Sequence, residues 1–357
     1  MKNFPRLAVR LLAMSLVLGG LSLSSCKKDD TTTVTGDWTT GNSFAGTARN
    51  NSVSFVINNI AYVGTGIDAS SNIYNDLYSY NPATGGWNKL TPMPAAAGVR
   101  YRAVAFVAGG KGYVGTGYNG SKALSDFWQF DPAGSTSTTT NGVTTTTSGS
   151  WKQVADLTTA TGGTARYWAV AGSVSDMGYV GCGYDGNYEK DFYKYNPTTD
   201  KWSVVNNFPG DKRMGGLTFT INGEMYVATG INNNQYNTDV SSYNPVSDTW
   251  TVHRNLKNQT TGSDIYDYSA VARAYAGGFV VNNLAYVTVG SNTSVRTDCF
   301  VYDPAADTWT LKNPFLGSGR NYSVSFGING IGYVGLGSSG TSSFDDFWKF
   351  APDADQE

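Results

Sequence analysis

The sequence Tyr-Val-Gly-Thr-Gly occupies residues 62–66 and is repeated without change at residues 113–117. Variants of the same five residues follow at 179–183 (YVGCG), 226–230 (YVATG), 286–290 (YVTVG) and 333–337 (YVGLG). The Tyr that begins each box recurs after 51, 66, 47, 60 and 47 residues. A base period of about 48–50 residues, with two insertions, indicates an array of one supersecondary unit in six copies.

Other residue types keep register with these boxes. An arginine stands 13 positions before each Tyr, as Arg49, Arg100, Arg166, Arg213, Arg273 and Arg320. An aspartate stands 12 to 14 positions after each Tyr, as Asp76, Asp126, Asp191, Asp239, Asp298 and Asp346. A proline follows six positions after each aspartate, as Pro82, Pro132, Pro197, Pro245, Pro304 and Pro352. A tryptophan comes five positions later in four repeats, as Trp87, Trp202, Trp250 and Trp309, and at Trp151 in the second repeat.

This register predicts four short strands in each unit. The first strand follows the arginine, as in residues 104–107, and the second is the Tyr-Val-Gly box. The third begins at the aspartate, as in residues 191–195, and the fourth carries the tryptophan. The runs are rich in β-branched and aromatic residues, which favour strands. The proline ends the third strand because it cannot donate to a ladder.

The period, the glycines after the second strand and the tryptophan in the fourth resemble the kelch repeat. The resemblance covers residues 36–352 and implies an all-β fold, a six-bladed β-propeller with four antiparallel strands per blade around a central channel. The pattern departs from the kelch repeat at one point. Kelch repeats usually have two adjacent glycines after the second strand, whereas this chain has Gly-x-Gly or the second glycine alone.

The two ends of the repeat array complement each other. The sixth repeat has no tryptophan after Pro352, and residues 353–357 form a short tail. Trp38 stands 11 residues before Arg49, the same spacing as from Trp202 to Arg213. We therefore expect the strand around Trp38 to complete the last blade and close the ring. The Thr- and Gly-rich insertion at 133–150 is of low complexity, and we expect it to be disordered.

The first 25 residues have the features of a secretory signal. Three basic residues precede a short apolar run, which suits a signal peptide better than a membrane span. The run ends in Leu-Ser-Ser-Cys at 23–26, which resembles the lipobox of bacterial lipoproteins and implies lipidation of Cys26. The following Lys-Lys-Asp-Asp resembles the surface-export signal of Bacteroidetes lipoproteins. We expect an outer membrane lipoprotein with a flexible tether at 26–35. It would be displayed on the cell surface or, alternatively, held on the periplasmic side of the membrane. Protease added to intact cells would degrade the protein only in the first case.

Charge and cysteine content exclude several classes of partner. Without residues 1–25 the chain has 22 basic and 27 acidic residues, a balance that does not favour a nucleic-acid partner. Cys182 and Cys299 occupy non-equivalent positions in different repeats, so we expect small buried residues and no disulfide framework. Because the sequence has no Cys/His cluster, nucleophile elbow or phosphate loop, we expect no metal and no cofactor. We also expect a monomer.

The six register arginines are the main candidates for a ligand-binding face, because they follow connections that emerge on one side of the ring. Aromatic residues stand beside them at Tyr101, Tyr167, Trp168, Tyr275 and Tyr322, and such side chains suit sugar rings and peptides. The ring would then attract an anionic glycan or protein. The alternative is structural, with each arginine paired to an aspartate of its own or the next blade.

Two other features on this side of the ring bear on function. The connection at 251–272 is the longest of its kind and contains Asp264, Tyr266, Asp267 and Tyr268, so we expect it to contact a ligand. Glu189 is the one glutamate expected on the arginine face, and general acid–base catalysis there would need such a carboxylate.

We expect a lipid-anchored binding module for a glycan or protein. A metal-independent enzyme such as an acidic-sugar mutarotase or epimerase is the alternative, and a purely structural surface protein is a third. The resemblance to kelch-type copper oxidases does not extend to their chemistry. Those enzymes need two histidines, whereas this chain has one, His253, which we expect to be an ordinary surface residue.

Overall fold

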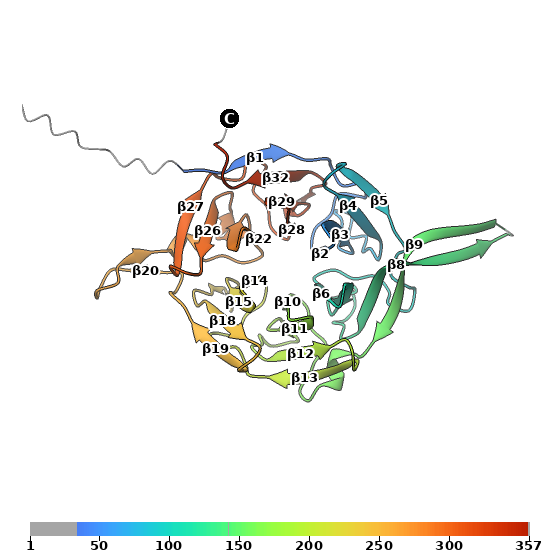
Figure 1. The fold of residues 1–357 in the computed structure, drawn as a ribbon, viewed down its shortest axis with the longest axis horizontal. Helices are drawn as coiled ribbons and strands as arrows, with labels where there is room; N and C mark the ends of the chain where they lie inside the picture. The colour runs from blue at the N-terminus through green and yellow to red at the C-terminus, as the bar shows by residue number, and fades with distance from the viewer. Residues whose placement is uncertain (1–33, 142, 356–357) are drawn as a thin grey trace, which may run out of the picture. The chain divides into compact units, whose positions relative to one another are not determined.

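The computed structural model describes residues 34–355 except residue 142. Six four-stranded antiparallel sheets stand around a central axis as the blades of a propeller (Figure 1). The predicted all-β, six-bladed fold is confirmed. The helical segments in the described part are two single 3-10 turns, η1 (Leu157–Thr159) and η2 (Ser269–Val271).

Each blade runs from the innermost strand at the axis to the outermost strand at the rim. Blades 1 to 3 comprise β2 (Val53–Ile57), β3 (Ile60–Gly64), β4 (Leu77–Asn81) and β5 (Gly86–Lys89); β6 (Val104–Ala108), β7 (Lys111–Gly115), β8 (Phe127–Thr140) and β9 (Val143–Val154); and β10 (Val170–Val174), β11 (Met177–Gly181), β12 (Phe192–Asn196) and β13 (Lys201–Val205). Blades 4 to 6 comprise β14 (Leu217–Ile221), β15 (Glu224–Ala228), β18 (Ser241–Asn244) and β19 (Thr249–Val252); β22 (Gly277–Val281), β23 (Leu284–Thr288), β26 (Cys299–Asp303) and β27 (Thr308–Lys312); and β28 (Val324–Ile328), β29 (Ile331–Gly335), β32 (Phe347–Ala351) and β1 (Asp37–Thr40).

Four short hairpins decorate the connections between these strands. They are β16 (Ile231–Asn232) with β17 (Gln235–Tyr236), β20 (Asn258–Gln259) with β21 (Tyr266–Asp267), β24 (Ser291–Asn292) with β25 (Ser294–Val295), and β30 (Ser338–Ser339) with β31 (Ser342–Ser343).

The hydrophobic core lies between neighbouring blades. In blade 1, Phe55 of β2 and Tyr62 of β3 are opposite each other in the ladder, and their rings stack with centroids 5.1 Å apart. Both rings also pack against Phe130 of blade 2. Aromatic pairs in this arrangement contribute beyond the area they bury. The Tyr of each box therefore joins one sheet to the next, and the box recurs because every blade needs this contact.

In the four boxes that have a glycine at the third position, this glycine is required by a close approach. A Cβ at Gly115 would lie 2.3 Å from the ring of Phe127, which crosses directly over it. The second glycine is required by its backbone conformation. Gly117 has φ of +94°, and its N–H donates to the carbonyl of Arg166 in the next blade at 2.8 Å. An L side chain is strained at such φ values.

The tryptophans of the outermost strands connect adjacent blades. The indole N–H of Trp202 in blade 3 donates to the carbonyl of Ala155 after blade 2, at 2.8 Å. Equivalent bonds join Trp87 to Asn42, Trp151 to Thr91, Trp250 to Asn206 and Trp38 to Asn313. Five of the six blades are thus bonded at the rim through buried or half-buried indoles. The indole N–H of Trp309 in blade 5 is buried without a hydrogen-bond partner.

The N-terminal strand β1 lies at the outer edge of blade 6. It pairs antiparallel with β32, with Trp38 opposite Phe350. Trp38 is 2% exposed, and its ring packs against Phe350 at 4.6 Å and Phe315 at 5.0 Å. Blade 6 therefore contains strands from both ends of the described chain, and β1 occupies the position that the tryptophan strand has in the other blades.

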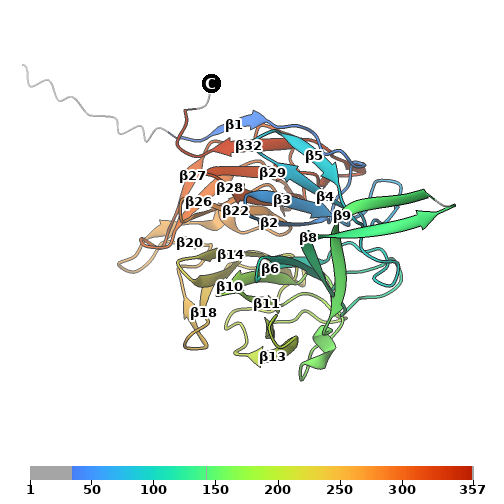
Figure 2. The same cartoon turned by 45° about the vertical axis from the view of Figure 1, so that its right-hand side comes forward.

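The prediction of disorder for residues 133–150 is wrong. Strands β8 and β9 extend beyond the blade as a two-stranded ribbon that projects away from the ring (Figure 1, Figure 2). The ribbon is rich in threonine, whose branched Cβ favours strands. Cross-strand hydroxyl pairs add to it, with Ser137 and Thr146 at 2.8 Å and Thr139 and Thr144 at 2.9 Å. Low complexity was mistaken for a lack of β propensity.

The signal peptide at 1–25, the lipid on Cys26 and the tether up to residue 33 lie outside the described residues and stay predictions. Within the described part, none of the helical segments has the length and apolar character that a membrane crossing requires.

Candidate functional site

The six register arginines are buried in ion pairs with the register aspartates. Arg166 is 0% exposed and binds Asp191 through two hydrogen bonds of 2.5 and 2.8 Å. It also donates to the carbonyl of Cys182, the variable residue of its own box, at 2.9 Å. Burial alone would lower the pKa of Arg166, but the hydrogen bond and charge of Asp191 outweigh it and hold the pKa above its ordinary value.

The same arrangement occurs in every blade. The pairs are Arg49–Asp76, Arg100–Asp126, Arg166–Asp191, Arg213–Asp239, Arg273–Asp298 and Arg320–Asp346. All six arginines are 0% exposed, so their guanidinium groups present no surface to a ligand. The structure therefore agrees with the structural alternative, in which each arginine pairs with an aspartate. Each pair is formed within one blade.

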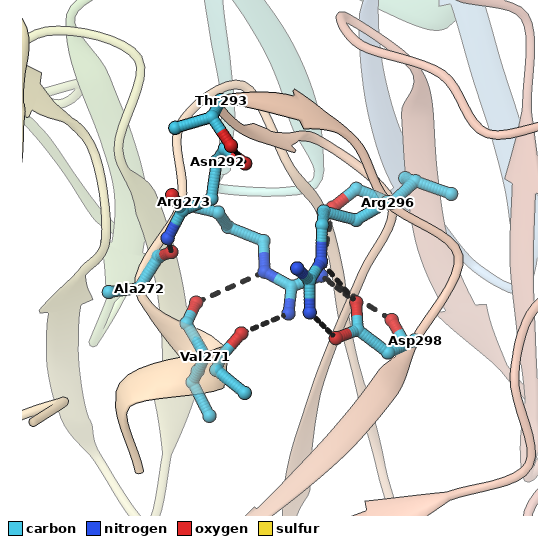
Figure 3. A network of polar contacts seen from close by, with 9 residues as sticks. Val271, Ala272, Arg273, Asn292, Thr293, Arg296 and Asp298 are labelled. Carbon is cyan, nitrogen blue, oxygen red and sulfur yellow. Dashed lines mark hydrogen bonds and ion pairs between the residues drawn. The ribbon is translucent and has the colours of Figure 1, made fainter. Parts of the chain in front are cut away.

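Blade 5 has the most elaborate of these networks (Figure 3). Asp298 contacts both Arg273, at 2.8 Å, and the half-exposed Arg296. Arg273 also donates to the carbonyl of Val271 at 3.0 Å, which fixes the chain before the inner strand. Burial raises the pKa of Asp298, but the bonds and charges of the two arginines outweigh it, so its pKa lies below 3.8.

We expect acid to destabilise the propeller through these carboxylates. The folded state lowers the pKa of Asp298 and of Asp346 below 3.8. A depressed carboxylate pKa contributes stability that is present above the unfolded value and is lost as the pH falls through the folded value. Thermal unfolding followed from pH 7 down to pH 3 should show a melting temperature that falls steeply below a pH of about 4. A melting temperature that is flat down to pH 3 would contradict this reading of the pairs.

A second register position surrounds the mouth of the channel. The residue two positions after each register arginine has φ between 51° and 61°, and its backbone turns toward the axis. These residues are Asn51, Arg102, Trp168, Gly215, Tyr275 and Tyr322. The N–H of each donates to the carbonyl of the one in the preceding blade, at 2.8 to 3.1 Å, and the sixth bond returns to the first. A closed ring of backbone hydrogen bonds therefore frames the mouth.

Three of these six side chains form an aromatic cluster over the axis. The Trp168 ring lies 4.9 Å from Tyr275 and stacks on Tyr322 at 5.8 Å, while Tyr275 and Tyr322 are 4.6 Å apart. Tyr275 lies across Gly215, where a Cβ would be 2.3 Å from the ring. The indole N–H of Trp168 donates to the side-chain oxygen of Asn51 at 2.8 Å. Bulky residues at positive φ cost about 1–3 kcal/mol each and persist only when their surroundings fix them, as the bonded ring does here.

Arg102, which is not among the predicted site residues, is the cation of this mouth. Its guanidinium carbon lies 3.9 Å from the centroid of Trp168 and 4.7 Å from that of Tyr101. Among the described residues, every other arginine has a carboxylate within ion-pairing distance, whereas Arg102 has none. Its Nε is buried without a hydrogen-bond partner. The sequence feature that could have identified Arg102 is its place outside the arginine register and next to an aromatic residue.

The mouth encloses a cavity of about 160 Å³ above the central channel. Its lining combines the six ring residues with the small residues that directly precede the innermost strands. A deeper part of the channel, of about 210 Å³, is lined on all sides by these strands, at Ser54, Ala105, Ala171, Thr218, Gly278 and Ser325. Neither lining contains an aspartate or glutamate among the residues that the structure describes. The lining of the mouth cavity is therefore aromatic and cationic and contains no carboxylate.

The aromatic candidates are brought together by the fold, and Glu189 is not. Tyr167 lies 5.5 Å from the guanidinium carbon of Arg102, and Tyr101 packs on the same group. Glu189 lies at the junction of blades 3 and 4, where its carboxylate is 3.8 Å from the Lys212 ammonium. Burial raises the pKa of Glu189, and the positive charge of Lys212 offsets part of this rise. It does not line the mouth cavity.

The connection at 251–272 lies away from the mouth. It carries the β20–β21 hairpin, which protrudes from the outer edge of the ring (Figure 1). Tyr266 and Tyr268 stack on each other at 4.7 Å, and Asp264 pairs with Arg254. The residues of this connection line neither cavity of the channel. The connection therefore lies apart from the mouth, because its length extends outward from the rim, and its contact with a ligand stays a prediction.

The single histidine is half-buried, so its description as an ordinary surface residue is wrong. His253 stacks on Tyr226 with centroids 5.2 Å apart, and its Nε2 is 2.9 Å from the hydroxyl of Ser242. Burial lowers the pKa of His253. The predicted burial of Cys182 and Cys299 is confirmed, and burial raises the pKa of each thiol to about 12. No group of three or more possible metal ligands occurs in the described part of the chain.

Comparison with known proteins agrees with this architecture. The family model described as the KLHDC2/KLHL20/DRC7 Kelch-repeats domain matches residues 24–215, and the Kelch motif matches residues 213–255. The chain is 36% identical over 109 residues to the N-acetylneuraminate epimerases of Escherichia coli O1:K1 / APEC and of Escherichia coli strain UTI89 / UPEC. These alignments cover 29% of this chain and 28% of the epimerases.

A solved structure titled "Structure of YjhT" superimposes with a TM-score of 0.65 at 14% identity, over 85% of this chain and 95% of that one. At this identity the likeness concerns the fold. The family matches, the box and its register arginines, and the six blades agree: the chain belongs to the kelch-repeat family.

Proposed function

We propose that this propeller binds an acidic sugar at the mouth of its central channel, with Arg102 receiving the acidic group. One observation carries the proposal. Arg102 has no carboxylate partner in the described chain and lies over an aromatic cluster, in a cavity whose described lining has no acidic residue. A guanidinium held in this way is preorganised for a carboxylate, which it can bind through two parallel hydrogen bonds.

The rest of the mouth has the chemistry of a sugar site. The faces of Trp168, Tyr275 and Tyr322 offer flat apolar surface for the C–H faces of a pyranose, and their polar edges suit its hydroxyls. Asn51 adds an amide at the same level. The partial match to N-acetylneuraminate epimerases supports an acidic sugar as the ligand class. Binding in the mouth requires no movement of the six buried ion pairs.

Arg102→Met is expected to weaken binding of N-acetylneuraminate roughly 10- to 100-fold. The substitution removes hydrogen bonds to a charged group, which are worth about 1.5–3 kcal/mol, while the methionine keeps much of the packing on Trp168. Isothermal titration of residues 34–357 with N-acetylneuraminate measures the dissociation constant. Arg254→Met is the matched control, because Arg254 lies on the outer edge and is paired with Asp264. The affinity of this variant for N-acetylneuraminate should equal that of the wild type. Equal affinity in Arg102→Met, or no binding by the wild type, would refute the proposal.

The epimerase match favours a second candidate, catalysis on the same sugar. General acid–base catalysis needs a proton-transferring group in the mouth, and the described lining offers tyrosine hydroxyls but no carboxylate. Proton NMR of N-acetylneuraminate with the protein reports the rate of anomer interconversion, which a binding module leaves at its uncatalysed value. The lipid anchor on Cys26 and display at the cell surface stay part of this proposal, and they would place the mouth where extracellular sugars are met.

A further inference from the structure

We infer that the ligand is an acidic sugar chain, held in a trench that crosses the whole face of the propeller through the mouth. The inference rests on the proposed function, because it extends the same site. The trench is defined by three cavities. They are the mouth itself, a cavity between blades 6 and 1, and a cavity between blades 3 and 4.

The positions of the three cavities make them collinear. The cavity between blades 6 and 1 has about 320 Å³ and shares Asn51, Arg102 and Tyr322 with the mouth, so the two are continuous. The cavity between blades 3 and 4 has about 300 Å³ and is lined by Tyr184, Tyr188 and four polar residues, with a glycine between them. In a ring of six blades these two junctions are diametrically opposite (Figure 1). A ligand confined to the mouth would leave both outer cavities unused.

An unbroken series of aromatic rings joins the mouth to the cavity between blades 3 and 4. The centroids of Tyr188 and Tyr184 are 5.2 Å apart, those of Tyr184 and Tyr167 are 5.6 Å apart, and those of Tyr167 and Trp168 are 5.5 Å apart. Trp168 then stacks on Tyr322, which also lines the cavity between blades 6 and 1. All these side chains are partly exposed. Consecutive rings from Tyr188 to Trp168 meet at interplanar angles of 52° to 78°, so the series offers several separately oriented faces. Such a series suits successive sugar rings, whereas one sugar would need a single stacking face.

The charges along the trench select an acidic chain. Arg102 lies at the mouth, and Lys212 lines the cavity between blades 3 and 4, where its half-exposed ammonium lies 3.8 Å from the Glu189 carboxylate. Two cations are therefore spaced along the path, and the ligand would share the second with Glu189. The carboxylate at the opposite end is already satisfied. Asp68 accepts hydrogen bonds from the backbone of Ser70 and Asn72 and from the Tyr74 hydroxyl, at 2.7 to 2.9 Å. These bonds lower its pKa against the effect of burial. A ligand with two acidic groups would place one at Arg102 and the other at Lys212, in competition with Glu189.

The polar lining favours sugars over a peptide. Asn187, Asn232 and Asn233 line the cavity between blades 3 and 4, together with the two tyrosines and Lys212. Amides and aromatic rings suit hydroxyl-rich ligands, whereas peptide grooves offer aliphatic pockets or a free strand edge. The lining of this cavity, all of it described, contains no aliphatic side chain. An acidic peptide is the competing ligand that the test must separate.

The test is the dependence of affinity on chain length. Isothermal titration compares α2,8-linked N-acetylneuraminic acid as monomer, dimer and tetramer, together with a poly-glutamate peptide of similar length. We expect at least a tenfold lower dissociation constant for the tetramer than for the monomer, and no binding of the peptide. Tyr188→Ala should bring the ratio of the two constants close to one, while Tyr266→Ala, a tyrosine of the β20–β21 hairpin, should leave the ratio as in the wild type.

The outcomes separate the trench from the mouth. Equal affinity for monomer and tetramer would overturn the trench and leave the acidic-sugar site intact. The trench would also be overturned if Tyr188→Ala keeps the wild-type ratio of the two dissociation constants and the wild-type melting temperature. Binding of poly-glutamate with the affinity of the tetramer would overturn the assignment to sugars. Failure of every sugar to bind would overturn the proposed function together with this inference.

Discussion

Arg166→Met is expected to lower the free energy of unfolding by about 3–5 kcal/mol, as removal of one partner of a buried ion pair does. The substitution leaves Asp191 without its partner and removes the donor to the Cys182 carbonyl. A buried or half-buried group that loses its partner costs its full desolvation free energy. Equilibrium unfolding in urea, followed by the fluorescence of the blade tryptophans, measures the change.

The control for this prediction is an ion pair outside the register. Lys111 and Asp131 form a pair in blade 2 whose two side chains are both 34% exposed. Lys111→Met should cost less than about 1 kcal/mol, because exposed pairs are worth little. If Arg166→Met and Lys111→Met have equal effects, the register arginines do not hold the blades in the way that their geometry indicates.

The arginine explains why the box has the form Gly-x-Gly. In every blade a register arginine donates to the carbonyl of x, at 2.8 to 3.2 Å. The residue x has positive φ, and the glycine after it donates to the register arginine of the next blade. The side chain of each register arginine therefore fixes the turn of its own blade. The backbone carbonyl of the same arginine accepts a bond from the second glycine of the preceding blade. Residues 49–66 contain both halves of this contact, which is why the sequence repeats them.

The fold could be predicted from the sequence because the repeat register is enforced by local contacts. The arginine 13 positions before each box and the aspartate after it pair within one blade, and the Tyr of the box stacks on the innermost strand of the same blade. Their spacing is therefore kept from repeat to repeat within this chain. The ribbon at 133–150 escaped prediction because a threonine-rich run lacks the alternation of apolar and polar residues that marks a half-buried strand. Its strands are held by hydroxyl pairs and backbone bonds.

The candidate site was predicted in part. Trp168, Tyr275 and Tyr322 were identified from their place beside the arginines, and they do line the mouth. Arg102 was missed because it lies off the register, in the ring position where other blades have aromatic or small residues. A function that belongs to one blade leaves no periodic signal. Side chains that differ among equivalent positions, rather than those that repeat, therefore mark the site.

Trp38→Ala is expected to destabilise the propeller by about 3–5 kcal/mol, as large aromatic truncations in cores do. Trp38 is 2% exposed, packs on Phe350 and Phe315, and donates to the carbonyl of Asn313 at 3.0 Å. Its strand is the outermost of blade 6 and comes from the other end of the chain. Loss of the ring should therefore free β1, expose the edge of β32 and make residues 34–40 sensitive to protease, which limited proteolysis followed by mass spectrometry measures.

Thr40→Ala is the matched control, because Thr40 lies on the same strand with an exposed side chain and keeps the same backbone pairing with Trp348. It should change the free energy of unfolding by less than about 0.5 kcal/mol and leave the strand protected. Equal protease sensitivity in both variants would show that β1 is held by its backbone bonds alone. A small effect of Trp38→Ala with full protection would mean that blade 6 is stable without the indole, and that the ring is kept closed by the contacts around its mouth.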